Sequence, residues 1–450
     1  MKKYLFFLGM AGLSLFASCS SADDVVEPEL SAEEINRMII QAGMDSDVPI
    51  NLGAGSGQGI SSVTRAPIES TGANNTFTTP DYMGVFLLAQ KPQSTPTTPG
   101  PLPEDQIVWN TSIYSAKMWN HPAKAIERDT WNEQAVTAYT YVAFYDPATL
   151  SGTPSTKVYY YPYGNWYNYY FYTYYPRVAD NLVTKDPNSN VVTVPYTLTG
   201  REDILCGTAT PPTAKMDEGF CAKYYREIRN SNEQLVPFDA LPGMQLKHTL
   251  AQLRFWVKSD KAPTKTFKIA SLKLVDVPTQ WTLTVADKSD IAKSGTMTSA
   301  SETTAPMNVS EMTVDNDGVT PLTVSDDSKL DVTDDQSWLP LTITEQLVGY
   351  LMIPTTDMIT TANTALNRDF PVKPRVQLQY YYDDELSLEL ESPVEIALPT
   401  TSHKFEAGKV YNIILTIPVP EGLDATAQTD PWVVVDPSAN NEQNIHVTAE

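Results

Sequence analysis

The sequence is poor in cysteine, in histidine and in positive charge. Of its 450 residues three are cysteine and four are histidine, and 31 lysines and arginines face 54 aspartates and glutamates, for a formal net charge of −23. A surface of this sign repels phosphate, which argues against nucleic acid and anionic lipid as partners. It suits a surface protein that repels its own copies.

A catalytic or metal-binding constellation is also missing from the sequence. None of the four histidines has a partner at HxxxH or HExxH spacing. Ser56 in "GAGSGQG" lacks the glycine two residues earlier that a nucleophile elbow needs, and "DNDG" at 315–318 lacks the other ligands of an EF-hand loop. We therefore expect no catalytic residue, no metal, no cofactor and no enzymatic activity.

Long apolar runs are absent apart from one near the start. Lys2 and Lys3 precede an apolar run at 4–16, and small residues lead to Cys19. This is the order of a secretory signal peptide, and the run is too short to span about 30 Å of hydrocarbon. A plain signal peptide with an incidental cysteine remains an alternative. The position of Cys19 favours a lipoprotein signal at 1–18, with the lipid attached to Cys19.

The dominant pattern in the rest of the chain is alternation with period two, which is typical of β-strands. Asn, Asp, Gly and Pro separate the alternating segments, as expected for short antiparallel strands packed into sandwiches. The five clearest segments are 135–145, 190–198, 249–257, 267–277 and 375–391. The sequence therefore predicts an all-β fold.

Other segments divide the chain. The polar, proline-containing stretch at 230–245 indicates a domain boundary, and residues 91–106, 287–337 and 420–431 are expected to be loops or linkers. Residues 31–43 predict one helix, with Ser31 as N-cap, Glu34 as its capping-box partner and Gly43 at its end.

An aromatic run at 158–177 has two interpretations. As a strand it would place one row of aromatic side chains on each face. An exposed row would offer a stacking platform for sugar rings. The simpler interpretation is a strand of a sandwich with one tyrosine row in the core.

Two cysteines remain besides Cys19. Cys206 and Cys221 would close a short loop if they paired in an oxidising envelope, but two isolated thiols are weak evidence for a disulfide. The sequence leaves both states open.

Both ends of the chain carry a short half-apolar segment on a polar tether. Near the start, residues 46–53 place Val48, Ile50 and Leu52 at alternate positions, followed by a Gly/Ser-rich spacer that contains Arg65. Near the end, residues 444–450 place three apolar residues at the same spacing: Ile445, Val447 and Ala449. Either segment has the pattern of a strand with one apolar face, so either could fill one groove. Arg65 is either a solvated linker residue or a cleavage site.

Motifs spread over most of the chain resemble those of the Bacteroidales fimbrillins, the subunits of type V pili. Beside the lipobox at Cys19, they are "VTRA" ending at Ala66, "YMGVFLL", "TAYTYVAFYDP", "YTYYP", "TLTGREDILCGTA", "LKHTLAQLRFWV" and "FEAGKVYNIILTI". Each motif is loose, and their order carries the resemblance.

The resemblance implies two transthyretin-like β-sandwich domains in tandem, with a cleavable N-terminal strand and a C-terminal strand. On this basis the chain divides into a signal peptide (1–18), a propeptide with a releasable strand at 46–53 (19–65), two sandwiches (66–236 and 237–419) and a tail with a candidate donor strand (420–450). Asp23 and Asp24 resemble an acidic tag that directs lipoproteins to the outer face of the cell.

The resemblance also implies a mechanism. The lipoprotein would be anchored in the outer membrane and cut between Arg65 and Ala66 by an arginine-specific protease. The released strand would leave a groove for the C-terminal strand of another pilin subunit, and the resulting fimbrium would serve cell adhesion to a host or bacterial ligand. Alternatives are a glycan-binding surface lipoprotein, which predicts an exposed tyrosine run, and a secreted hydrolase, for which no convergent site can be assembled.

Overall fold

A computed structural model provides the structure of this chain. It describes residues 45–49, 53–56, 79, 81–92, 108–110, 116–131, 134–150, 153–155, 159–162, 167–209, 220–221, 225, 242–275, 277–301, 305–308, 310–313, 323–324, 339–354, 375–382, 385–386, 394–395, 405–419, 432–436 and 442–448.

The predicted all-β class is confirmed. Strands make up almost all of the regular structure in these residues, together with the short 3-10 turns η2 (Asp180–Leu182) and η5 (Ile291–Lys293). All five segments with clear alternation form strands: β5 (Gln134–Phe144), β9 (Val191–Thr197), β12 (Leu250–Ser259), β13 (Phe267–Val275), and β21 (Arg375–Tyr382) with β22 (Glu385–Leu386). Within the described ranges, no helix is long and apolar enough to cross a bilayer.

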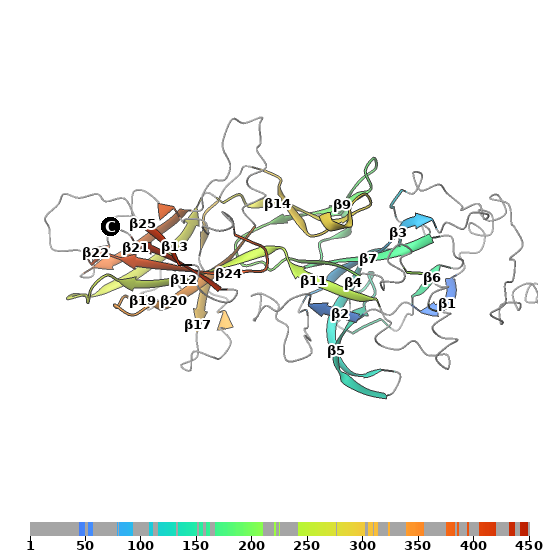
Figure 1. The fold of residues 1–450 in the computed structure, drawn as a ribbon, viewed down its shortest axis with the longest axis horizontal. Coiled ribbons are helices and arrows are strands. Elements are labelled where there is room, and N and C mark those ends of the chain that lie inside the picture. Colours follow the sequence, from blue (N-terminus) through green and yellow to red (C-terminus); the bar gives the residue numbers. More distant parts are fainter. Residues whose placement is uncertain are drawn as a thin grey trace, which may run out of the picture. The chain divides into compact units, whose positions relative to one another are not determined.

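One sheet of seven strands closes on itself. Its order is β10-β11-β2-β5-β4-β3-β7, and β10 also pairs with β7, which completes the ring. Figure 1 shows these strands in blue to green, apart from β11, which is yellow-green. The bounds not yet given are β2 (Gly53–Ser56), β3 (Met83–Pro92), β4 (Ala116–Trp131), β7 (Tyr167–Tyr175), β10 (Leu205–Ala209) and β11 (Gly243–His248). Separately, β1 (Asp45–Pro49) pairs antiparallel with β6 (Tyr160–Pro162).

A four-stranded antiparallel sheet has the order β15-β14-β9-β8. Its other members are β8 (Thr184–Asp186), β14 (Gln280–Asp287) and β15 (Thr296–Ser299). The β9–β14 ladder joins segments from both sides of the expected boundary at 236/237, for example Val194 opposite Leu283. The boundary itself stays a prediction.

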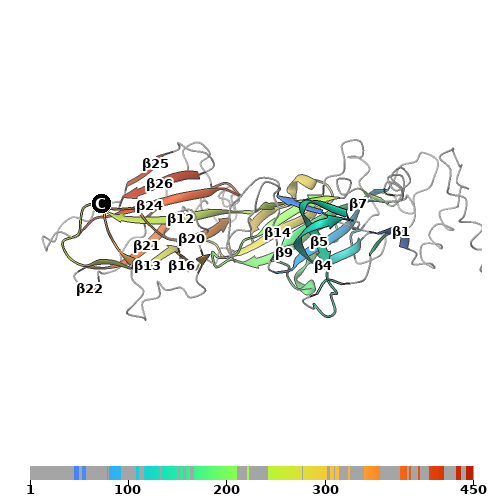
Figure 2. The same cartoon turned by 90° about the horizontal axis from the view of Figure 1, so that it is seen from below.

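Two further sheets are formed by the C-terminal half of the sequence. The larger has the order β18-β17-β20-β12-β24-β26-β25, and Figure 2 shows β12, β24, β26 and β25 as successive strands. The smaller has the order β16-β13-β21-β22, with β19 also on β13 and β23 also on β21. The new bounds are β16 (Met307–Asn308), β17 (Ser310–Thr313), β18 (Thr323–Val324), β19 (Leu339–Pro340), β20 (Gln346–Pro354), β23 (Val394–Glu395), β24 (Val410–Ile417), β25 (Trp432–Asp436) and β26 (Glu442–Thr448).

The prediction of a continuous loop at 287–337 is wrong. This segment contains η5 and the short strands β15 to β18. Met297 and Met307 explain part of the difference, because both side chains are buried in the hydrophobic core. The surrounding residues are mostly Ser, Thr and Asp, so the composition of the segment predicted a loop although these two methionines are buried.

Candidate functional site

The candidate site is the place that β2 occupies in the closed sheet, here called the slot. β2 lies between β11, with which it runs parallel, and β5, with which it runs antiparallel. Ala54 is opposite Met244 on one side and Thr140 on the other. Neither neighbour is adjacent to β2 in sequence, and β2, a strand of four residues, joins them in the ring (Figure 1).

The walls of the slot alternate between core and solvent. Met244 and Leu246 on β11 are buried, as is Thr140 on β5, whereas Gly243 and Gln245 on β11 are exposed. Positions paired across a sheet share a face. The positions of Ala54 and Ser56 therefore belong to the core face, and those of Gly53 and Gly55 to the outer face.

The strand in the slot is not the apolar segment expected from the sequence. Val48 lies in β1, which pairs with β6 instead, and the ring is closed by the small residues of "GAGS". Ile50 and Leu52 lie outside the described residues. One signal in the sequence could have located β2. Ala54 and Ser56 stand at the same alternate positions as Val48, Ile50 and Leu52 and so continue their period-two pattern.

The C-terminal segment forms a hairpin on its own subunit. β26 runs parallel to β24, with Ile445 opposite Ile413 and Val447 opposite Leu415, and β25 pairs antiparallel with β26. Figure 2 shows the two strands beside β24. Like β2 in the slot, β26 has one parallel and one antiparallel neighbour. Its role as a donor strand stays a prediction.

Several predicted site residues lie outside the described ranges. They are the lipidation site Cys19, the cleavage pair Arg65 and Ala66, and Ala449 at the end of the candidate donor; the expected helix at 31–43 also lies outside them.

An exposed tyrosine row on β7 is not found. In residues 169–175 both faces of the strand are buried, so the expectation of a single core row is wrong. On one face Phe171 packs against Tyr161 and Phe220, with ring centroids 6.2 Å and 5.7 Å apart. On the other, burial and the nearby Tyr170 and Asp287 raise the pKa of Tyr172 far above its usual value. A stacking platform for sugars is thus absent from this part of β7.

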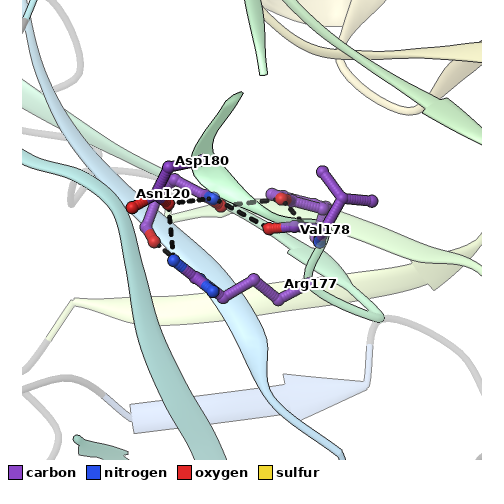
Figure 3. A network of polar contacts seen from close by, with 5 residues as sticks. Asn120, Arg177, Val178 and Asp180 are labelled. Atoms are coloured by element: carbon purple, nitrogen blue, oxygen red, sulfur yellow. Dashed lines mark hydrogen bonds and ion pairs between the residues drawn. The ribbon is translucent and has the colours of Figure 1, made fainter. Parts of the chain in front are cut away.

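A polar network centred on the buried Asn120 and Tyr174 links β4 to the turn after β7. Asn120, with φ of 46°, accepts a hydrogen bond from the Tyr174 hydroxyl at 2.7 Å and donates to the carbonyl of Val178 at 3.0 Å and the carboxylate of Asp180 at 2.7 Å. Arg177 donates to the backbone carbonyl of Asn120 and binds Asp180 (Figure 3). The network joins β4 to the end of β7, and neither of these strands pairs with β2. We assign the network a structural role.

A second polar cluster holds the end of β11, one wall of the slot. The Nδ1 atom of His248, which is half-buried, lies 2.7 Å from a carboxylate oxygen of the buried Asp203. The neighbouring Glu202 carboxylate accepts hydrogen bonds from the backbone N–H groups of Thr199, Gly200 and Arg201. The His248–Asp203 contact joins the loop before β10 to β11, and the Glu202 hydrogen bonds hold that loop together.

Cys206 and Cys221 are both buried, and the structure has no disulfide between them. Desolvation raises the pKa of the Cys206 thiol to about 11, and its sulfur lies 3.5 Å from the hydroxyl oxygen of Ser294. A neutral, buried thiol reacts slowly. Their pairing in an oxidising compartment stays a prediction.

Within the described part of the chain, no three His, Cys, Asp or Glu side chains gather closely enough to hold a metal ion. The slot itself pairs with β2 on both sides and contacts the core on one face, an arrangement suited to recognition of an extended backbone.

No family model matches the chain, and no curated protein sequence matches it. Solved structures do. A candidate cell adhesion protein from Bacteroides ovatus aligns with 12% identity over 82% of this chain and 92% of its own, at a TM-score of 0.37. Another from Bacteroides uniformis has 12% identity, coverage of 82% and 93%, and a TM-score of 0.34.

A fimbrial protein from Bacteroides vulgatus aligns with 14% identity over 75% of this chain and 88% of its own, at a TM-score of 0.33. The proteins that this chain resembles in structure are thus fimbrial and candidate adhesion proteins of the Bacteroidales, the group that the sequence motifs indicated. At these TM-scores the likeness is distant, and no residue role is taken from it.

Proposed function

We propose that this chain is a structural, non-enzymatic subunit of a cell-surface pilus, and that its subunits join by exchange of a β-strand. The observation that carries the proposal is the pairing of β2 on both of its edges within the closed sheet. A four-residue strand with no large side chain completes a closed sheet from a segment that ends shortly before Arg65.

The cut between Arg65 and Ala66 acts as the assembly switch. While the chain is intact, the tether keeps β2 at high effective concentration beside β5 and β11, so a strand from another molecule cannot compete. After the cut β1 and β2 are held only by their own contacts. Their departure leaves two unpaired strand edges, which bind an added strand readily.

The C-terminal strand of another subunit fills the opened slot. Ile445, Val447 and Ala449 provide the apolar face, and main-chain hydrogen bonds to β5 and β11 provide affinity. In this proposal the subunit is a lipoprotein anchored through Cys19 in the outer membrane until the arginine-specific protease releases it into the fimbrium. A subunit with both a slot and a donor strand belongs to the stalk or to an accessory position, in a pilus that mediates cell adhesion.

The tandem arrangement that accompanies this proposal keeps the boundaries 66–236 for the first domain, 237–419 for the second domain and 420–450 for the tail. The slot takes one wall from each side of the first boundary, β5 before it and β11 after it. A glycan-binding lipoprotein is less well supported, because the described aromatic side chains of β7 are buried on both faces.

Limited proteolysis tests the proposal. Recombinant chain starting at Ser20 is treated with an arginine-specific protease, the new N-terminus is read by mass spectrometry, and the product is run unboiled on a denaturing gel. We expect a product that begins at Ala66 and a ladder of multimers, and no ladder from Arg65→Ala. Cleavage at Arg65 without multimers would contradict strand exchange.

A further inference from the structure

We propose that the slot selects its strand by side-chain size, and that residues 445–449 of a second copy enter with Val447 in the place of Ala54 and Ala449 in the place of Ser56. This inference rests on the proposed function and adds the register of the incoming strand and the residues that determine its specificity.

The core side of the slot has little room. The position of Ala54 is flanked by Thr140 and Met244, and that of Ser56 by Leu246, and these three side chains are at most 4% exposed. Filled cores resist added methylene groups. Met244 is the most adaptable of the three, because methionine is unbranched. The first position should therefore accept Val, and the second only a residue close in size to Ser.

The backbone of β11 at Leu246 cannot move toward β10 to enlarge the slot. Behind it lies Gly207 of β10, which pairs with Leu246. A Cβ atom on Gly207 would overlap the carbonyl oxygen of Gln245 and lie 2.7 Å from its carbonyl carbon. The backbones of β10 and β11 are thus already in contact at the closest approach that glycine allows.

The outer side of the slot imposes no such limit. The position of Gly53 lies opposite Gly243, which is exposed and would have nothing within 4 Å of an added Cβ. The position of Gly55 lies opposite Gln245, which is also exposed. On the β11 side both positions are thus open toward solvent, and on the β5 side the position of Gly53 lies opposite the half-buried Tyr141.

The C-terminal segment satisfies both conditions in one register. Its alternate residues Ile445, Val447 and Ala449 place a large side chain first and a small one last, as Leu52, Ala54 and Ser56 do. The same alignment puts His446 and Thr448 at the two outer positions. The incoming strand then runs parallel to β11 and antiparallel to β5, as β2 does.

A peptide-binding experiment tests the register. The full chain is cut after Arg65 at high dilution in the presence of a fluorescent peptide of residues 442–450, so that the peptide and not another copy meets the opened slot, and binding is measured by anisotropy. We expect Ala449→Leu in the peptide to weaken binding about tenfold or more, because it overfills the core side. The matched control Thr448→Leu, on the outer side, should change affinity by less than about twofold. Equal effects of the two substitutions, or a larger effect of Thr448→Leu, would overturn the inference.

A second peptide separates this inference from the proposed function. It spans residues 52–58 and carries the native β2 sequence. If it binds the cut chain and the 442–450 peptide does not, the slot opens but the assigned donor is wrong. If neither peptide binds, the slot does not open, which overturns the proposed function and the inference together.

Discussion

At the scale of single residues, the closed sheet depends on places where only glycine fits. A Cβ atom on Gly84 of β3 would overlap Tyr174 Cε1 and Asn120 Oδ1, both parts of the polar network. We expect Gly84→Ala to lower the free energy of unfolding by about 1–3 kcal/mol, the usual effect of overpacking. Chemical denaturation of the intact chain measures the change.

Gly243 provides the matched control for this prediction. It is also a strand glycine, but a Cβ there meets nothing within 4 Å. Gly243→Ala should therefore change stability by less than about 0.5 kcal/mol. Similar losses for the two variants would show that the network around Asn120 is not tightly packed.

Two buried tyrosines give a pH-dependent prediction. Burial raises the pKa of Tyr350 and of Tyr411 to about 12, from a usual value of 10.0. A raised pKa means that the folded state holds the phenol proton more tightly, so the contribution to stability is complete below pH 10 and is lost as the pH rises through about 12. Unfolding free energies measured between pH 9 and pH 12 should fall, and more gently in Tyr350→Phe.

The two tyrosines should differ at neutral pH. The Tyr350 hydroxyl has no hydrogen-bond partner among the described residues, so Tyr350→Phe should leave stability unchanged or raise it slightly. The Tyr411 hydroxyl accepts a hydrogen bond from the Glu406 N–H at 2.9 Å, so Tyr411→Phe should lower stability by about 1 kcal/mol. A loss in Tyr350→Phe equal to that in Tyr411→Phe would contradict this account.

The aromatic run at 158–177 shows which structural properties the pattern of residue types can predict and which it cannot. Alternation indicated a strand correctly, but it cannot say whether one face or both are covered. Side chains from elsewhere in the sequence cover β7. On the face that carries Phe171, for example, these are Tyr161 and Phe220. Such coverage depends on long-range packing, which period-two patterns do not record.

At the scale of elements, β2 is the strand whose loss should matter most. Proline cannot donate a ladder hydrogen bond and is poorly tolerated within a strand that has neighbours on both sides. We expect Gly55→Pro to weaken β2 enough that multimers form without protease, as seen by size-exclusion chromatography. Gly57→Pro, just beyond β2, is the control and should stay monomeric until it is cut. Monomeric Gly55→Pro would mean that β2 does not block the slot.

The elements also differ in how well the sequence predicts them. Strands with uninterrupted alternation, such as β9 and β12, were expected almost to the residue. β4 was not expected, because His121, Pro122 and several charged residues interrupt its pattern, and Asn120 adopts a positive φ within it. β2 was missed for a different reason: glycine and serine are typical of loops, and only pairing on both sides holds them in a strand.

At the scale of the whole molecule, charge should control how fast subunits meet. The full chain has a formal charge of −23, and residues 66–450, which remain after the cut, carry −19, so two cut copies repel at low ionic strength. Salt screens this repulsion over a Debye length of about 10 Å at 0.1 M. We expect the multimers formed after the cut to grow several-fold faster in 0.15 M NaCl than in 10 mM, measured by light scattering. Growth that slows with added salt would indicate attraction between oppositely charged surfaces.

The most direct test of strand exchange uses two variants that can each perform half of the reaction. A chain that is cut after Arg65 and lacks residues 442–450 can accept a strand but not donate one, and uncut Arg65→Ala can donate but not accept. Native mass spectrometry of the mixture should show a dimer with one copy of each, and no larger species. Absence of the mixed dimer, or dimers of either variant alone, would contradict assembly by exchange of the C-terminal strand into the slot of β2.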